Sequence, residues 1–227
     1  MTTAMINTAQ LLWRYLLIFV VSYLLGSISF SIIISKLFFH DDIRNYGSGN
    51  AGMTNVLRTF GRGAAAATLI GDAAKGFISV QIARLIMKGL PLFNITDPTT
   101  YFKWGLYIAV AGALLGHLRP VYFQFKGGKG VSVATGALLA VNPIQILIVA
   151  IIFLLTVFFS RIVSLASILA AASYSITTIV LYYVRGNILL PDIIAAIVFP
   201  RVIIYAHRSN IKRLLNGTEY KFGQTKK

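Results

Sequence analysis

Long apolar runs, separated by short polar segments, make up most of this chain. A helix needs about 20 apolar residues to cross the hydrocarbon of a bilayer, and several runs approach that length. They cover residues 15–39, 63–87, 102–118, 131–141, 163–184 and 188–206, with a further run from Asn142-Pro143 to Phe159. The pattern predicts an all-α, polytopic membrane protein with about seven transmembrane helices in one domain, residues 1–227. The segment 131–141 is short, which leaves open whether it crosses completely.

Composition also points to a lipid environment. Hydrophobic residues make up 57% of the chain and charged residues 12%, whereas about 25% of the residues in soluble domains are charged. The first apolar run is too long for a cleaved signal peptide and no small-residue cleavage site follows it, so we expect a retained helix. The chain has no cysteine, which excludes disulfides, cysteine nucleophiles and zinc-thiolate sites.

The chain is strongly basic, with 21 Lys and Arg against 6 Asp and Glu and a net charge of +15. Such an excess fits an anionic membrane surface or an anionic substrate. Nucleic acid is not expected as a partner, because the basic residues lie in short blocks between long apolar runs. A lipid bilayer with phosphate chemistry at its surface fits better.

Lysine and arginine favour the cytoplasmic side of a membrane protein, and this bias predicts the orientation. With seven spans, an N-terminus outside and a C-terminus in the cytoplasm put most basic residues inside. Lys75 and Arg201 then fall within the membrane, and the outside holds only Arg14, Arg84, Lys88, Lys103 and Arg185. Three polar, glycine-rich or basic stretches all fall on the cytoplasmic side, which suggests that they form one site.

The first stretch covers Tyr46–Arg58. Its three closely spaced glycines let the backbone approach a ligand and expose its N–H groups, and four uncharged polar residues add further hydrogen-bonding groups: Gly47, Gly49 and Gly52, with Ser48, Asn50, Thr54 and Asn55. A helix that begins near Met53 would place Thr54 and Arg58 on one face. Amides at a helix start, together with an arginine, form an anion site. A glycine-rich turn with a capping threonine would leave the same pattern.

The second stretch covers Gly116–Gly130. Lys126 and Lys129 bracket Gly127 and Gly128 immediately before an apolar segment. The arrangement is similar in its physics to a phosphate loop, but it lacks the Walker spacing and a preceding strand, so nucleotide binding is not expected. The alternative is a basic interfacial loop that contacts lipid headgroups.

The third stretch covers His207–Glu219, at the end of the last span. His207 and Asn210 share a helical face, and Gly217 predicts the end of the helix. The alternative is an ordinary basic juxtamembrane helix whose cations face lipid phosphates, namely Arg208, Lys212 and Arg213.

Two charged residues, Asp72 and Lys75, lie within a predicted span. An unpaired charge at such a depth costs roughly 3 kcal/mol or more, so we expect them to form an ion pair. His117 ends the third span and is either a site residue or a packed interfacial histidine. The acidic residues are scattered without the spacing of a metal cage, and no metal site is expected.

At these stretches the chain resembles the acyl-phosphate:glycerol-3-phosphate acyltransferases of bacterial membranes. That family shows G-S-G-N-x-G-x-T-N-x-x-R, matched at residues 47–58, and G-H-x-x-P with F-K-G-G-K-G, matched at residues 116–130. It also shows H-R-x-N-I-x-R-L-L-x-G-x-E, matched at residues 207–219. The departures are Arg119, where an aromatic or apolar residue is usual, and a looser continuation at residues 131–135.

The resemblance implies transfer of an acyl group from acyl phosphate to the 1-hydroxyl of glycerol 3-phosphate, giving lysophosphatidic acid at the cytoplasmic face of the bacterial inner membrane. It implies no cofactor. The expected catalytic residues are Ser48, Arg58, Lys129, His207 and Asn210. The expected substrate-binding residues are Gly47, Gly49, Asn50, Gly52, Thr54, Asn55, His117, Lys126, Gly127, Gly128, Gly130, Arg208, Lys212 and Glu219.

Within that reaction the general base stays open, because either His207 or a substrate phosphate could accept the proton. A transporter of a phosphorylated polyol is the alternative function, since intramembrane charge and broken helices are common in transporters. An acyltransferase that uses a thioester is disfavoured, because no histidine is followed five residues later by aspartate.

Overall fold

The computed structural model describes residues 8–88 and 98–222, and their regular structure is entirely helical, as predicted. The chain divides into two compact units, residues 1–141 and 142–227. The organisation as a single domain stays a prediction.

The first unit contains α1 (Thr8–Gly26), α2 (Phe30–Phe39), the 3-10 helix η1 (Ile43–Asn45), α3 (Met53–Phe60), α4 (Arg62–Lys88), α5 (Pro98–Leu118), the 3-10 helix η3 (Val121–Phe123) and α6 (Val131–Val141). The second contains α7 (Pro143–Ser160), α8 (Val163–Arg185), α9 (Leu190–Ala206) and α10 (Arg208–Leu215).

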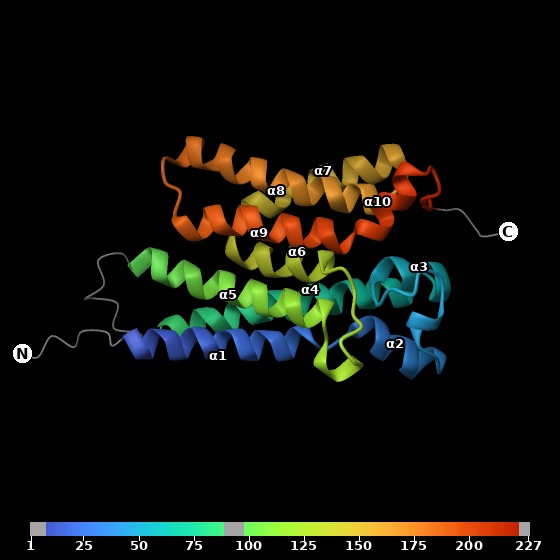
Figure 1. Ribbon diagram of the computed structural model, residues 1–227, viewed down its shortest axis with the longest axis horizontal. Helices are drawn as coiled ribbons and strands as arrows, with labels where there is room; N and C mark the ends of the chain where they lie inside the picture. Colours follow the sequence, from blue (N-terminus) through green and yellow to red (C-terminus); the bar gives the residue numbers. More distant parts are fainter. Residues whose placement is uncertain (1–7, 89–97, 223–227) are drawn as a thin grey trace, which may run out of the picture. The chain divides into compact units, whose positions relative to one another are not determined.

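The first apolar run, predicted as one helix over residues 15–39, is broken between α1 and α2. Ser27, Ile28 and Ser29 form the break. Serine hydroxyls compete with the helical main chain for hydrogen bonds, and the Ser27 hydroxyl donates to the Tyr23 carbonyl at 2.8 Å. In Figure 1, α2 and α3 lie together at one end of the first unit, beyond the long helices α1, α4 and α5. The break therefore sets a group of short helices apart from the long ones.

Glycines bring the helices of the first unit into close contact. A Cβ at Gly112 or Gly116 of α5 would overlap main-chain atoms of α1. Gly76 of α4 and Gly136 of α6 each lie in the same way against the main chain of the other helix. Small residues permit this close approach between helices in a membrane, where van der Waals packing drives association.

Four stretches of the described residues are long and apolar enough to cross a membrane, and a fifth is reached if the bent pair α9–α10 counts as one span. The four are Ala9–Phe39, Thr99–Phe123, Pro143–Ser160 and Val163–Val184. The 27 residues of α4 are long enough but carry Asp72 and Lys75. The 11 residues of α6 span only about 16 Å, about half of the hydrocarbon thickness. The total of about seven crossings and the orientation of the termini stay predictions.

In the second unit, α8 packs against both α7 and α9. One face of α7 is covered with exposed large apolar side chains, such as Leu147, Leu154 and Phe158, which is expected of a surface that faces lipid. Pro200 lies inside α9 and cannot donate a hydrogen bond to the carbonyl of Ala196. The Ser175 hydroxyl of α8 donates to that carbonyl instead, at 2.6 Å. A neighbouring helix thus satisfies the polar group that the proline leaves without a partner.

Candidate functional site

Asn55 closes the loop of the first glycine-rich stretch. The helix predicted to begin near Met53 is α3, and Asn55 in its first turn is only 2% exposed. Its amide oxygen accepts a hydrogen bond from the main-chain nitrogen of Ser48 at 3.0 Å. Its amide nitrogen donates to the carbonyls of Ile43 at 3.1 Å and Tyr46 at 2.9 Å. All three contacts are with main-chain atoms, so Asn55 sets the path of the loop.

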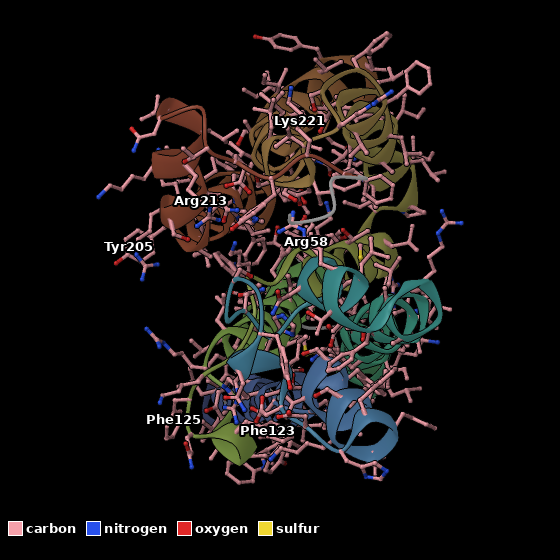
Figure 2. All side chains as sticks on the ribbon, turned by 90° about the vertical axis from the view of Figure 1, so that its right-hand side faces the viewer. Arg58, Phe123, Phe125, Tyr205, Arg213 and Lys221 are labelled. Atoms are coloured by element: carbon pink, nitrogen blue, oxygen red, sulfur yellow. The ribbon has the colours of Figure 1, made fainter. Side chains whose placement is uncertain are left out.

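The loop that Asn55 closes exposes Gly47, Ser48 and Gly49 at its surface. Gly47 and Gly49 both have positive φ angles, 56° and 69°, a conformation that glycine adopts readily. Both are exposed, as are Ser48 and Arg58, whereas Asn50, Gly52 and Thr54 are half-buried. In Figure 2 the Arg58 label marks α3 on the side of the first unit that faces the viewer. The main chain of residues 47–49 is therefore accessible, and the anion site at this loop stays a prediction.

Arg44, which the sequence analysis did not single out, joins this loop to the second stretch. Its guanidinium donates to both carboxylate oxygens of Asp42, at 3.0 and 2.7 Å, and to the main-chain oxygen of Phe123 at 3.0 Å. The hydrogen bond from Arg44 holds the pKa of Asp42 below its ordinary value, and the same contact raises the pKa of Arg44. The sequence signal was an aspartate and an arginine two residues apart, just ahead of the glycines.

The second stretch turns sharply after α5. Gln124 and Phe125 both have left-handed φ angles of 58°, which cost about 1–2 kcal/mol per residue without glycine. Phe125 is exposed, and Figure 2 shows it beside Phe123 at an edge of the first unit. Lys126 is exposed and Lys129 is half-buried. Gly130 has a φ of 83°, and α6 begins at the next residue.

The two glycine-rich stretches meet at Gly128. Its main-chain nitrogen donates to the His117 carbonyl at 3.1 Å. A Cβ at Gly128 would overlap both the His117 ring and the Ala51 carbonyl, and a Cβ at Gly127 would overlap the His117 carbonyl. We call Ala51, His117, Gly127 and Gly128 the glycine junction. It brings the first two predicted stretches together, and it depends on the absence of side chains at two positions.

His117 is packed inside the first unit with the two charges of α4. The expected ion pair is confirmed, since the Lys75 ammonium lies 2.8 Å from the Asp72 carboxylate. Lys75 also lies 3.1 Å from Nδ1 of His117, and all three side chains are at most 4% exposed. The contacts of His117 thus lie within the protein interior.

The third stretch has its own polar cluster in the second unit. His207 lies where α9 and α10 meet at an angle of 63°, and its Nδ1 contacts the Ile203 carbonyl at 2.8 Å. The Asn210 amide donates to one carboxylate oxygen of Glu219 at 2.9 Å, and Arg213 donates to the other at 2.7 Å. The predicted helix end at Gly217 is confirmed, with a φ of 67°.

The cations of the third stretch lie at its surface. Arg208 and Lys212 are exposed, whereas His207 and Asn210 are buried. Figure 2 labels Arg213 and Lys221, both of the second unit. The third stretch belongs to a different unit from the glycine junction, so the convergence of all three stretches on one site stays a prediction. Among residues 8–88 and 98–222, no group of His, Asp and Glu side chains is arranged to hold a metal ion.

Comparison with known proteins agrees with the motifs. A family model described as glycerol-3-phosphate acyltransferase matches residues 16–217. A glycerol-3-phosphate acyltransferase of Bordetella pertussis (strain Tohama I) is 41% identical over 232 residues, covering 100% of both chains. One of Clostridioides difficile (strain 630) is 41% identical over 215 residues, covering 95% of this chain and 98% of the relative.

Two solved structures share the fold. Both are crystal structures of PlsY (YgiH), an integral membrane glycerol 3-phosphate acyltransferase. Its glycerol 3-phosphate form is 38% identical, with a TM-score of 0.76, and covers 92% of this chain and 96% of that chain. Its lysophosphatidic acid form is 36% identical, with a TM-score of 0.73 and coverages of 92% and 95%. Because the family model and these relatives match nearly the whole chain, this protein belongs to the glycerol-3-phosphate acyltransferase family.

Proposed function

We propose that this glycerol-3-phosphate acyltransferase takes its acyl group from acyl phosphate and transfers it to the 1-hydroxyl of glycerol 3-phosphate. The hydroxyl oxygen would attack the acyl carbon, the bond between that carbon and the phosphate oxygen would break, and inorganic phosphate would leave with lysophosphatidic acid as product. Because the donor is already activated and the chain has no cysteine, direct attack is simpler than a route through an acylated enzyme.

The glycine junction is the observation that carries this proposal. It holds two glycine-rich main-chain segments against each other, and Lys126 and Lys129 flank its glycines in the sequence, a combination that suits a phosphate-bearing donor. The amides of Gly127, Gly128 and Lys129, with the loop from Ser48 to Thr54, would bind the acyl-phosphate head. Arg58 and Lys129 would then stabilise the charge that develops during transfer.

Two phosphorylated substrates need several cations in one place. A phosphate ester carries about −1.5 to −2 charges near neutral pH, and two such groups about 5 Å apart repel by on the order of 10 kcal/mol at an effective dielectric of 20. Arg58, Lys126 and Lys129 of the first unit, with Arg208 and Lys212 of the second, would offset this repulsion. Their number suits a site with two anionic substrates better than a site with one.

The third stretch would orient glycerol 3-phosphate. His207 and Asn210, three residues apart, are both buried near the bend between α9 and α10, and the carboxylate of Glu219 accepts a hydrogen bond from the Asn210 amide. A hydrogen-bonded asparagine is held in one orientation, which suits a residue that positions a hydroxyl. The proton of the 1-hydroxyl would pass to His207 or to a substrate phosphate. We further propose that the site faces the cytoplasm from the bacterial inner membrane.

The donor is tested with purified full-length protein in detergent, labelled glycerol 3-phosphate and either palmitoyl phosphate or palmitoyl-CoA. We expect lysophosphatidic acid from palmitoyl phosphate alone. Product from palmitoyl-CoA instead would contradict the proposed donor. No product from either donor would favour the alternative of a transporter for a phosphorylated polyol, which transport into vesicles would then measure.

A further inference from the structure

A cluster of three titratable side chains lies buried inside the first unit. Asp72 and Lys75 belong to α4 and pair at 2.8 Å. His117 belongs to α5, and its Nδ1 lies 3.1 Å from the ammonium of Lys75 and 3.6 Å from the carboxylate of Asp72. Asp72 is 1% exposed, and Lys75 and His117 are each 4% exposed. The cluster therefore has no direct access to solvent or to a dissolved substrate.

The same lysine reaches a third element. Its ammonium donates to the carbonyl of Ile28 at 2.5 Å, and Ile28 lies in the break between α1 and α2. A carbonyl at such a break has no helical partner and needs one inside a membrane protein. Lys75 thus ties the break, α4 and the end of α5 to one point.

An ion pair at this depth is a costly way to hold helices together. Removing two charges from water costs several kcal/mol per ion, and well-packed apolar residues often stabilise a protein as well or better. Packing alone therefore gives no reason for charges here, and the reason has to be sought in what the pair contacts. The pair contacts the Ile28 carbonyl and His117, and His117 is the contact that leads to the glycine-rich loop.

His117 connects the cluster to the glycine junction. Nδ1 of His117 is the ring atom that faces the ion pair, at 3.1 Å from the Lys75 ammonium and 3.6 Å from the Asp72 carboxylate. Nε2 is the ring atom that faces Gly128, and together with the Ala51 carbonyl oxygen it fills the space that a Cβ of Gly128 would need. The His117 carbonyl also accepts the Gly128 amide hydrogen at 3.1 Å. The Nδ1 edge of the imidazole thus contacts the ion pair, and its Nε2 edge lies against the main chain of the loop.

We propose that Asp72, Lys75 and His117 are positioning residues for acyl transfer, which fix the main chain of Gly127 and Gly128 against Ala51 without contacting either substrate. This inference rests on the proposed role of the glycine junction in binding the donor phosphate. It reassigns His117, which the sequence analysis placed among the substrate-binding residues, to a role that acts through Gly128. A displacement of about 1 Å at a site that aligns reacting groups lowers the rate on the order of 100-fold.

The ion pair is tested with two variants of the full-length protein, Asp72→Asn and the double variant Asp72→Asn/Lys75→Met. The single variant leaves a buried charge without its partner and should unfold at a lower temperature. The double variant removes both charges and should recover most of the thermal stability. We expect its kcat to stay on the order of 100-fold low. If the double variant recovers both stability and kcat, the pair has only a structural role and the proposal is wrong.

The histidine is tested separately with His117→Asn. This variant keeps a polar atom near the position of Nδ1 and leaves the ion pair intact, but it removes the ring edge that faces Gly128. We expect a folded protein with an unfolding temperature close to that of the wild type and a kcat that falls as in the double variant. A kcat equal to that of the wild type in folded His117→Asn would overturn the proposal, even if the double variant failed to fold.

A matched control comes from the second unit. Gln145 is as deeply buried as the cluster, and its amide donates to the Tyr174 carbonyl at 3.1 Å and to the Thr178 hydroxyl at 2.7 Å. Gln145→Met removes a buried polar network of similar size, so it should lower stability and leave kcat of the folded fraction unchanged. All assays use whichever acyl donor the wild type accepts. If the proposed donor is wrong, the donor assay of the wild type will show it. If the positioning role is wrong, only the kcat values of the variants will show it.

Discussion

The guanidinium of Arg44 donates a hydrogen bond of 3.0 Å to the main-chain oxygen of Phe123, 79 residues further along the chain. The same group holds both carboxylate oxygens of Asp42. Planar, two-point pairing of this kind fixes the orientation of an arginine side chain. The contact with Phe123 therefore links the loop before α3 to the turn after α5 at a second place besides the glycine junction.

Arg44→Lys should weaken this link although it keeps the charge, because lysine cannot form the two-point contact with a carboxylate. We expect kcat/KM to fall about tenfold, equivalent to about 1.4 kcal/mol, with a modest loss of thermal stability. Steady-state kinetics and thermal unfolding in detergent measure both. Lys36→Gln is the control, because Lys36 lies 3.8 Å from Asp42 and is 54% exposed, and such surface pairs contribute little. Equal effects of the two substitutions would contradict the prediction.

The pairing of Asp42 with Arg44 should make stability depend on acidic pH. The hydrogen bond from Arg44 lowers the folded-state pKa of Asp42 below the value of about 3.9 in an unfolded chain. Its stabilising contribution is therefore complete above that unfolded value and is lost as the pH falls through the folded pKa. The difference in unfolding temperature between the wild type and Asp42→Asn should stay constant from about pH 7 to 5 and shrink below about pH 4. A difference that shrinks as the pH rises from 5 to 7 would rule this out.

Gly128→Ala should inactivate the enzyme more than it destabilises it. The added methyl group has to displace the His117 ring or the Ala51 carbonyl, and overpacking of this kind costs about 1–3 kcal/mol. We expect kcat on the order of 100-fold lower in protein that still unfolds cooperatively. Gly63→Ala is the matched control, since a Cβ at Gly63 meets nothing within 4 Å and alanine favours its helix. Normal kcat in Gly128→Ala would mean that the junction plays no part in the reaction.

Asn55→Asp should destabilise the first glycine-rich loop by removing the hydrogen bonds that hold it. An aspartate oxygen would replace the amide nitrogen that donates to the carbonyls of Ile43 and Tyr46, so two donated hydrogen bonds become two contacts between oxygens. We expect a loss of about 2–3 kcal/mol of stability together with a large rise in the KM for the acyl donor. The control is Asn187→Asp, the same change at an exposed residue between α8 and α9. A stable variant with normal KM would show that the loop does not depend on Asn55.

The predicted orientation can be tested with cysteine labelling, because the natural chain has no cysteine to give a background. Asn187 lies between α8 and α9, and Asn216 follows α10; both are exposed. With the C-terminus in the cytoplasm, a membrane-impermeant thiol reagent added to intact cells or spheroplasts should label Asn187→Cys and leave Asn216→Cys unlabelled. The opposite labelling would place the third stretch outside and contradict the cytoplasmic site.

The sequence alone predicted the helical class, the apolar segments, and the starts of α3 and α6. Each of these depends on local chemistry: apolar runs of a given length, and glycines next to helix starts. The resemblance in three motifs also predicted the family. These signals are readable because they lie within a few neighbouring residues.

Only the tertiary structure decided what several of the motif residues do. The motifs predict Asn55 and His117 as substrate-binding residues. The structure buries both, Asn55 against the main chain of its own loop and His117 against Asp72 and Lys75. Two hydrogen bonds join residues far apart along the chain. One runs from Arg44 to the Phe123 carbonyl, and the other runs from Lys75 to the Ile28 carbonyl in the break between α1 and α2. Local patterns cannot report such contacts, because which side chain meets which carbonyl depends on how helices pack, and here glycines at the helix contacts determine how closely they approach.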